Sequence, residues 1–122
     1  MTHRSGKKFF SRDASHRKAL FKNLCLSLIK HKQIKTTVAK AKYLRGYIEP
    51  LITKARNNPE ALSTRRYLIA KLGNKEAIEI LLKDLSKVYQ SRPGGYVRIL
   101  KIGKCRSGDS APMAYVQLID TF

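Results

Sequence analysis

The sequence has few acidic residues, and this shortage is its most informative property. Eight Asp and Glu stand against 26 Lys and Arg in 122 residues, so the formal net charge is +18 at pH 7. Asp13 is the one acid in the first 42 residues, and residues 14–48 contain none. A small domain charged only for solubility carries a net charge of magnitude roughly 2–8. Because a larger charge destabilises a compact chain by self-repulsion, the composition predicts a polyanionic partner.

Long apolar runs, clustered metal ligands and catalytic motifs are also missing. The apolar stretches are far shorter than the roughly 18 residues of a membrane span, and no apolar region near the start forms a signal peptide. Cys25 and Cys105 make no spaced pair, and three scattered histidines do not complete a zinc site. The glycine motifs that bind nucleotide phosphates are absent. We therefore expect a cytoplasmic, non-enzymatic protein with no cofactor, metal, membrane or small-molecule substrate.

The apolar residues that are present suffice for one folded domain. They make up 43% of the chain, and 122 residues is an ordinary size for a single core. Residues 1–12 contain four bases, no acid and no sustained periodicity, so we expect a basic arm ahead of a single α+β domain at 13–122. Phe9 and Phe10 in this arm can stack on the nucleobases of a nucleic-acid partner or dock on the domain. Docking on the domain is favoured.

Apolar side chains at three- and four-residue spacing predict four helices. The first begins at a cap provided by Ser11 or Asp13, and the second follows a cap at Thr36 or Thr37. Asn58 is the expected cap of the third helix, with a proline at its first helical position. The expected helices end near residues 30, 55, 72 and 88, and the fourth begins at residue 75.

Short β-branched segments predict a small mixed sheet on which these helices pack. In residues 33–37 the side-chain character alternates from one residue to the next, as in a short strand. Residues 96–102 and 113–119 are rich in β-branched and aromatic side chains. The last two form a hairpin, 96–119, with a long basic loop. The predicted fold is α+β.

Lys and Arg gather in the arm, the first predicted helix and the hairpin, three places that folding could bring together. A base that neutralises a phosphate releases counterions, so these clusters predict salt-dependent binding to nucleic acid. Two further arginines face outward from the third helix, and another lies in the turn before the hairpin. The bases selected in this way are Arg4, Lys7, Lys8, Arg12, Arg17, Lys18, Lys22, Arg65, Arg66, Arg92, Arg98, Lys101, Lys104 and Arg106.

The distribution of this charge favours RNA over DNA. Sequence-reading DNA proteins concentrate Arg, Asn and Gln at the start of one recognition helix, whereas Lys dominates here and the charge is spread over arm, helix and loop. Such a spread suits a folded RNA read by shape. A nucleoid-type DNA-binding protein is the alternative, and would need a dimer with a continuous basic face. A membrane-surface or calmodulin-target module would need an isolated basic amphipathic helix.

Two long blocks of residues carry a resemblance to a known family. The first block comprises Ser15–Leu20, Asn23–Leu24, Ser27–His31, Ile34, Thr36–Thr37, Ala39–Lys42 and Leu44–Arg45, and the second comprises Gly94–Lys101 and Arg106–Ala114. In order, spacing and total length they resemble the family of the seventeenth protein of the bacterial large ribosomal subunit.

This resemblance implies a structural component of the ribosome with an α+β fold, located near the exit side of the peptide tunnel. It implies large-subunit ribosomal RNA and neighbouring large-subunit ribosomal proteins as partners. Carried over by position, the residues that it implies for RNA contact are Arg4, Lys7, Lys8, His16, Arg17, Tyr96, Arg98 and Arg106.

Overall fold

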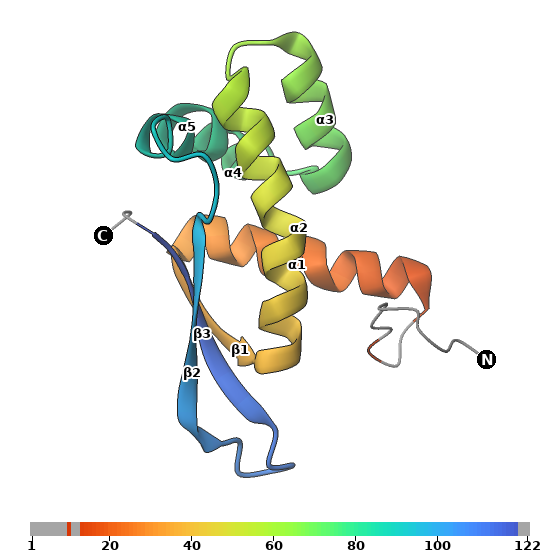
Figure 1. Cartoon of the computed structure of the whole chain (residues 1–122). Helices are drawn as coiled ribbons and strands as arrows, with labels where there is room; N and C mark the ends of the chain where they lie inside the picture. Colours follow the sequence, from red (N-terminus) through yellow and green to blue (C-terminus); the bar gives the residue numbers. More distant parts are fainter. Residues whose placement is uncertain (1–9, 11–12, 120–122) are drawn as a thin grey trace, which may run out of the picture.

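The structure is a computed structural model that describes residue 10 and residues 13–119. Along the chain the elements are α1 (Ala14–His31), β1 (Gln33–Thr37), α2 (Val38–Asn57), α3 (Leu62–Leu72), α4 (Lys75–Glu79), the π-helical segment η1 (Ile80–Leu85), α5 (Ser86–Val88), β2 (Val97–Cys105) and β3 (Pro112–Leu118) (Figure 1). Because α4, η1 and α5 follow one another without a gap, they form one helical run at 75–88. The predicted α+β fold with four helices is confirmed.

Local hydrogen bonds explain where most helices begin. The Asp13 carboxylate accepts from the His16 N–H at 2.8 Å, and the Thr37 hydroxyl accepts from the Lys40 N–H at 3.3 Å. These bonds satisfy donors that a helix start leaves open, as expected of N-cap residues. Gly73 ends α3 in the left-handed region, with φ 63°, where a residue without Cβ fits best. The caps predicted at 13 and 37 are confirmed.

The predicted start of the third helix is wrong. Asn58 ends α2 instead of capping α3, since its N–H donates to the Lys54 carbonyl oxygen at 3.3 Å. A turn follows, closed by the Ala61 N–H on the Asn58 carbonyl, and α3 begins at Leu62. Ala61 occupies the N-cap position without a side-chain hydrogen bond. The Asn-Pro pair therefore belongs to the connection between α2 and α3.

The sheet is entirely antiparallel, which corrects the predicted mixed sheet. Its order is β1-β3-β2, so the last strand lies between the other two. Val116 in the centre of β3 is opposite Ile34 on β1 and Ile99 on β2, and both pairings are antiparallel. The predicted hairpin is confirmed as β2 and β3. Its connecting loop, residues 106–111, is shorter than predicted because β2 extends to Cys105.

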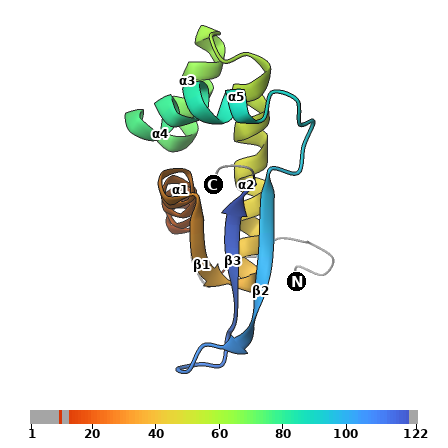
Figure 2. The ribbon, with the colours of Figure 1, turned by 90° about the vertical axis from the view of Figure 1, so that its left-hand side faces the viewer.

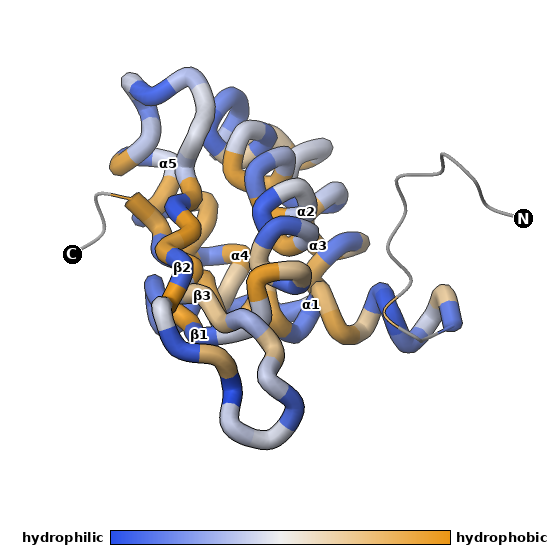
Figure 3. Tube along the Cα trace, turned by 60° about the horizontal axis from the view of Figure 1, so that its bottom comes forward, coloured by the Kyte–Doolittle hydropathy of each residue, from blue (hydrophilic) through white to orange (hydrophobic). Residues whose placement is uncertain are grey.

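One face of the sheet packs on helices and the other is uncovered. In Figure 2, β1, β3 and β2 lie in front of α2, and within the described part of the chain no helix crosses their near face. The β2–β3 hairpin extends past the helices at the bottom of Figure 1, while α3, α4 and α5 gather at the opposite end. Figure 3 shows hydrophilic residues in the hairpin loop and in the first turn of α1.

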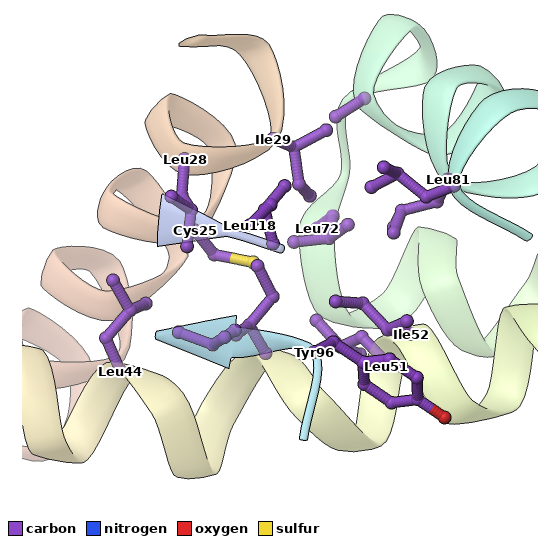
Figure 4. Close-up of a cluster of buried hydrophobic side chains, with 14 of the residues drawn as sticks. Cys25, Leu28, Ile29, Leu44, Leu51, Ile52, Leu72, Leu81, Tyr96 and Leu118 are labelled. Atoms are coloured by element: carbon purple, nitrogen blue, oxygen red, sulfur yellow. The ribbon is translucent and has the colours of Figure 1, made fainter. Parts of the chain in front are cut away.

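The core lies where α1, α2, the later helices and the inner face of the sheet meet. Cys25, Leu44, Leu72 and Leu118 come from four different elements and are almost completely buried (Figure 4). Burial raises the pKa of the Cys25 thiol to about 12, so this cysteine is an apolar core residue rather than a reactive thiol. Among the described residues no helix has the length and apolar character needed to cross a membrane.

Replacing one buried side chain of α2 tests this core. Ile48 is 0% exposed, so Ile48→Ala should lower the free energy of unfolding by about 2–5 kcal/mol through lost burial and a residual cavity. Leu62 is 62% exposed at the start of α3, so Leu62→Ala should change it by less than about 0.5 kcal/mol. Urea unfolding of the two variants measures both changes. A loss of unfolding free energy for Ile48→Ala as small as that expected for Leu62→Ala would place Ile48 outside the core.

Candidate nucleic-acid interface

The fold divides the chain into a nearly acid-free part and a part of more balanced charge. We call residues 14–48 and 93–119 the sheet end; they include α1, β1, the first half of α2, β2 and β3. They hold 13 Lys and Arg and one acid, Asp109. The remaining helical end, residues 49–92, holds nine bases and five acids. The excess charge is therefore concentrated on the end of the molecule that carries the sheet.

One acid of the helical end, Glu79, pairs with two bases within the protein. Glu79 accepts from the Arg65 guanidinium at 2.7 Å and lies 3.1 Å from the Lys83 ammonium. The hydrogen bond from Arg65, followed by that from Lys83, lowers the pKa of the Glu79 carboxyl. Arg65 was predicted to contact RNA, but its charge is already paired. Arg66, the next residue, is exposed and keeps the predicted role.

The bases of α1 and of the hairpin do not meet in one patch. In Figure 1 the first turn of α1 and the hairpin project from different sides of the molecule, with the first half of α2 between them. The expectation that folding could join these clusters is therefore not met. The sheet end instead presents two separate basic projections.

The first projection is the start of α1. His16 and Lys18 are exposed there, and Arg17 is half-buried. Asp13 accepts from the His16 backbone N–H at 2.8 Å and from the Ser15 hydroxyl at 3.2 Å, and these hydrogen bonds lower the pKa of its carboxyl. Asp13 thus supplies negative charge where the helix dipole disfavours bases.

Lys22 lies elsewhere, although its sequence position suggested the same cluster. A methyl group at position 73 would lie 3.2 Å from the Lys22 Nζ, so the ammonium sits beside the last turn of α3. The carbonyl groups at a helix C-terminus attract a positive charge. This half-buried position indicates a role in joining α1 to α3 rather than contact with RNA.

The second projection is the hairpin, whose tip is organised by Asp109. Its two carboxylate oxygens accept from the Arg106 Nε at 2.9 Å and Nη2 at 2.6 Å, and one oxygen also accepts from the Ala111 N–H at 3.2 Å. These bonds lower the pKa of Asp109 to about 2. Arg106, a predicted RNA-binding residue, therefore has a structural partner. The exposed bases of this projection are Arg98, Lys101 and Lys104.

Tyr96, which was predicted to contact RNA, has its side chain in the core. Its side chain is 0% exposed, its ring centroid lies 4.8 Å from that of Tyr89, and its hydroxyl accepts from the Thr53 hydroxyl at 3.4 Å. An aromatic residue beside a basic hairpin resembles a stacking residue in sequence, but here it closes the core below the sheet. Arg92 lies half-buried in the turn before β2, and its N–H donates to the Tyr89 carbonyl at 3.0 Å.

The predicted arm is described at one residue. Phe10 packs edge-on against Phe21, with ring centroids 5.1 Å apart, and against Tyr43, with centroids 5.7 Å apart. Docking of this phenylalanine on the domain is therefore confirmed. The remaining arm residues singled out from the sequence lie outside the described residues; they are Arg4, Lys7, Lys8, Phe9 and Arg12.

Sequence reasoning missed the bases between the two projections. Lys42 and Arg45 are exposed on the first half of α2, and Lys35 is exposed on β1. A groove of about 450 Å³ lies between the start of α2 and the start of β3, and Lys42 and Pro112 are among its lining residues. The acid-free run 14–48 was the signal that could have found these bases. Within the described residues, no group of three His, Cys, Asp or Glu is placed to hold a metal ion.

The chain is similar to a known protein family. The family model described as Ribosomal protein L17 matches residues 20–119. This range covers most of α1, all later helices and all three strands.

The hairpin tip should respond to acid in a way that identifies the Arg106–Asp109 pair. Because the fold lowers the pKa of Asp109 from 3.8 to about 2, the pair is intact above pH 3.8 and is lost as the pH falls through 2. The amide signal of Ala111, which donates to Asp109, should therefore titrate near pH 2 in NMR spectra. Asp109→Asn should remove this transition. A midpoint near pH 4 would show that the pair does not form.

Proposed function

The chain belongs to the ribosomal protein L17 family and is a structural, non-enzymatic component of the large ribosomal subunit, and we propose that it binds large-subunit ribosomal RNA by electrostatic clamping, through its two basic projections. Family membership implies association with this RNA and with other ribosomal proteins. The proposal adds the manner of binding, the residues that carry it and a position near the exit side of the peptide tunnel.

The observation that carries the proposal is the charge of the sheet end, with 13 bases and one acid. Side chains of one sign on a small body repel one another, and phosphates relieve this repulsion. About eight phosphate contacts would give a log–log salt dependence near −7 for duplex RNA, and a shallower one for single strands. The proposed contacts on described residues are His16, Arg17, Lys18, Lys42, Arg45, Arg66, Arg92, Arg98, Lys101 and Lys104.

The two projections and the arm are each proposed to bind phosphates of the RNA. The hairpin extends past the helices, so phosphates can approach Lys101 and Lys104 without steric hindrance from the core. The start of α1 presents His16 and Lys18 on another side. We also propose RNA contact for the arm bases Arg4, Lys7, Lys8 and Arg12, which lie outside the described residues.

The alternative of a nucleoid-type DNA-binding protein has less support. That function would need a dimer with a continuous basic face, whereas the start of α1 and the hairpin project from different sides of the body (Figure 1). Projections that reach in different directions suit a partner that surrounds the protein, as a folded ribosomal RNA can.

Neutralising the hairpin bases tests the clamp. The double variant Lys101→Gln with Lys104→Gln should weaken binding to a transcript of large-subunit ribosomal RNA and reduce the salt slope by about 2, because each lysine that contacts a phosphate contributes about 1. Filter binding over a range of salt concentrations measures both quantities.

A matched control comes from the helical end. Lys75→Gln with Lys87→Gln removes the same charge from two exposed positions there, and should leave the salt slope nearly unchanged. Equal effects of the two double variants would mean that binding follows net charge alone, which would contradict a clamp at the sheet end.

A further inference from the structure

The uncovered face of the sheet contributes only Arg98 to the proposed clamp. Successive side chains along a strand point to opposite faces of the sheet. A residue that lies next to a buried residue of its strand therefore points to the uncovered face. Ala114, Val116 and Leu118 are buried against the helices, which places Met113, Tyr115 and Gln117 of β3 on the uncovered face. By register, the same face carries Gln33, Lys35 and Thr37 of β1, and Arg98 and Leu100 of β2.

Tyr115 lies at the centre of this face. It is on the middle strand, directly opposite Lys35 on one side and Leu100 on the other. Tyr115 is 36% exposed and Leu100 is 42% exposed, so an aromatic ring and an aliphatic side chain are both open to solvent. Directly opposite residues on antiparallel strands have Cβ atoms about 4.5–5.5 Å apart. The Lys35 ammonium can therefore reach a group that covers the Tyr115 ring.

The next row across the sheet adds polar groups beside the ring. Gln117 Nε2 donates to Gln33 Oε1 at 2.8 Å, which holds both amides in place. Arg98 is opposite Gln117 and diagonal to Tyr115, and it is exposed. Each amide still has donor and acceptor capacity after this bond. A flat partner on Tyr115 would therefore find hydrogen-bonding groups at its edge and a cation on either side.

The charge of the three strands decides which partner fits. They contain four bases, namely Lys35, Arg98, Lys101 and Lys104, and no acid. A second copy of this chain, with a net charge of +18, would be repelled. A protein that covered the face would take Lys35 and Arg98 out of water with no acid of this chain to pair them, which is costly. An RNA strand supplies both an aromatic base and phosphates.

We propose that an unpaired base of the ribosomal RNA stacks on the Tyr115 ring, with its flanking phosphates at Lys35 and Arg98. This inference rests on the proposed RNA-binding function and adds a specific site to it. A base with an exposed π-face stacks on an aromatic side chain, whereas a base inside a duplex is already stacked on its neighbours. The site thus selects a looped or bulged nucleotide, while the two projections bind backbone without regard to pairing.

Substitution of Tyr115 tests the site in the full-length chain. Tyr115→Ala should weaken binding to a large-subunit ribosomal RNA transcript about 5- to 150-fold, the loss expected for one base–aromatic stack. The salt slope should stay unchanged, since no charge is removed. Tyr115→Phe keeps the ring and should bind like the wild type. Tyr115→Val keeps the preference for a strand but not the ring, so it should lose affinity as the alanine variant does even if the latter unfolds.

Crosslinking gives a second readout. Short-wavelength ultraviolet light should join the peptide that contains Tyr115 to a nucleotide that is unpaired in the ribosomal RNA. A crosslink to a paired nucleotide would contradict stacking, as would equal binding by the valine and phenylalanine variants. If the valine variant bound RNA normally but failed to enter reconstituted subunits, the face would be a protein contact and the inference would be overturned.

RNA binding by the wild-type chain separates a failure of the clamp from a failure of the stacking site. If the wild-type chain did not bind the transcript, or bound it with no salt dependence, the proposed function itself would fall. If it bound with a steep salt slope while Tyr115→Val bound equally well, the clamp would stand and the stacking site alone would be lost.

Discussion

Repulsion among like charges is the constraint on which the rest of this structure depends. The sheet end carries 13 bases and one acid, and that acid already pairs with Arg106. The protein limits the cost by keeping most of these bases exposed, where water and salt screen them, instead of burying them. The apolar core shared by both ends, together with the five acids of the helical end, provides the stability that lets the sheet end stay basic. Binding of a polyanion then relieves a repulsion that folding leaves in place.

The same division explains how a small protein can meet RNA in more than one way. The hairpin and the start of α1 present charge, which attracts any phosphate backbone. The uncovered sheet presents Tyr115 and a pair of glutamine amides, which can distinguish an unpaired base from a paired one. Charge would bring the protein to the RNA, and the sheet would favour one position on it. The rigid core holds these surfaces at fixed relative positions, which reduces the entropy lost on binding.

Local patterns predicted the parts of the fold that depend on neighbouring residues. The caps at Asp13 and Thr37 and the turn at Gly73 could be read from residue types, because their hydrogen bonds or backbone angles are local. Features set by distant contacts were missed. Tyr96 is buried against Tyr89 and Thr53, Arg65 is paired by Glu79 on another helix, and the position of β3 between β1 and β2 has no local signal.

The dependence of thermal stability on salt and RNA tests the central claim most directly. If repulsion at the sheet end limits stability, the melting temperature of the free full-length chain should rise with salt concentration. Adding a large-subunit ribosomal RNA transcript at low salt should raise it further, and this gain should fade as salt weakens binding. A melting temperature that responds to neither salt nor RNA would contradict the account.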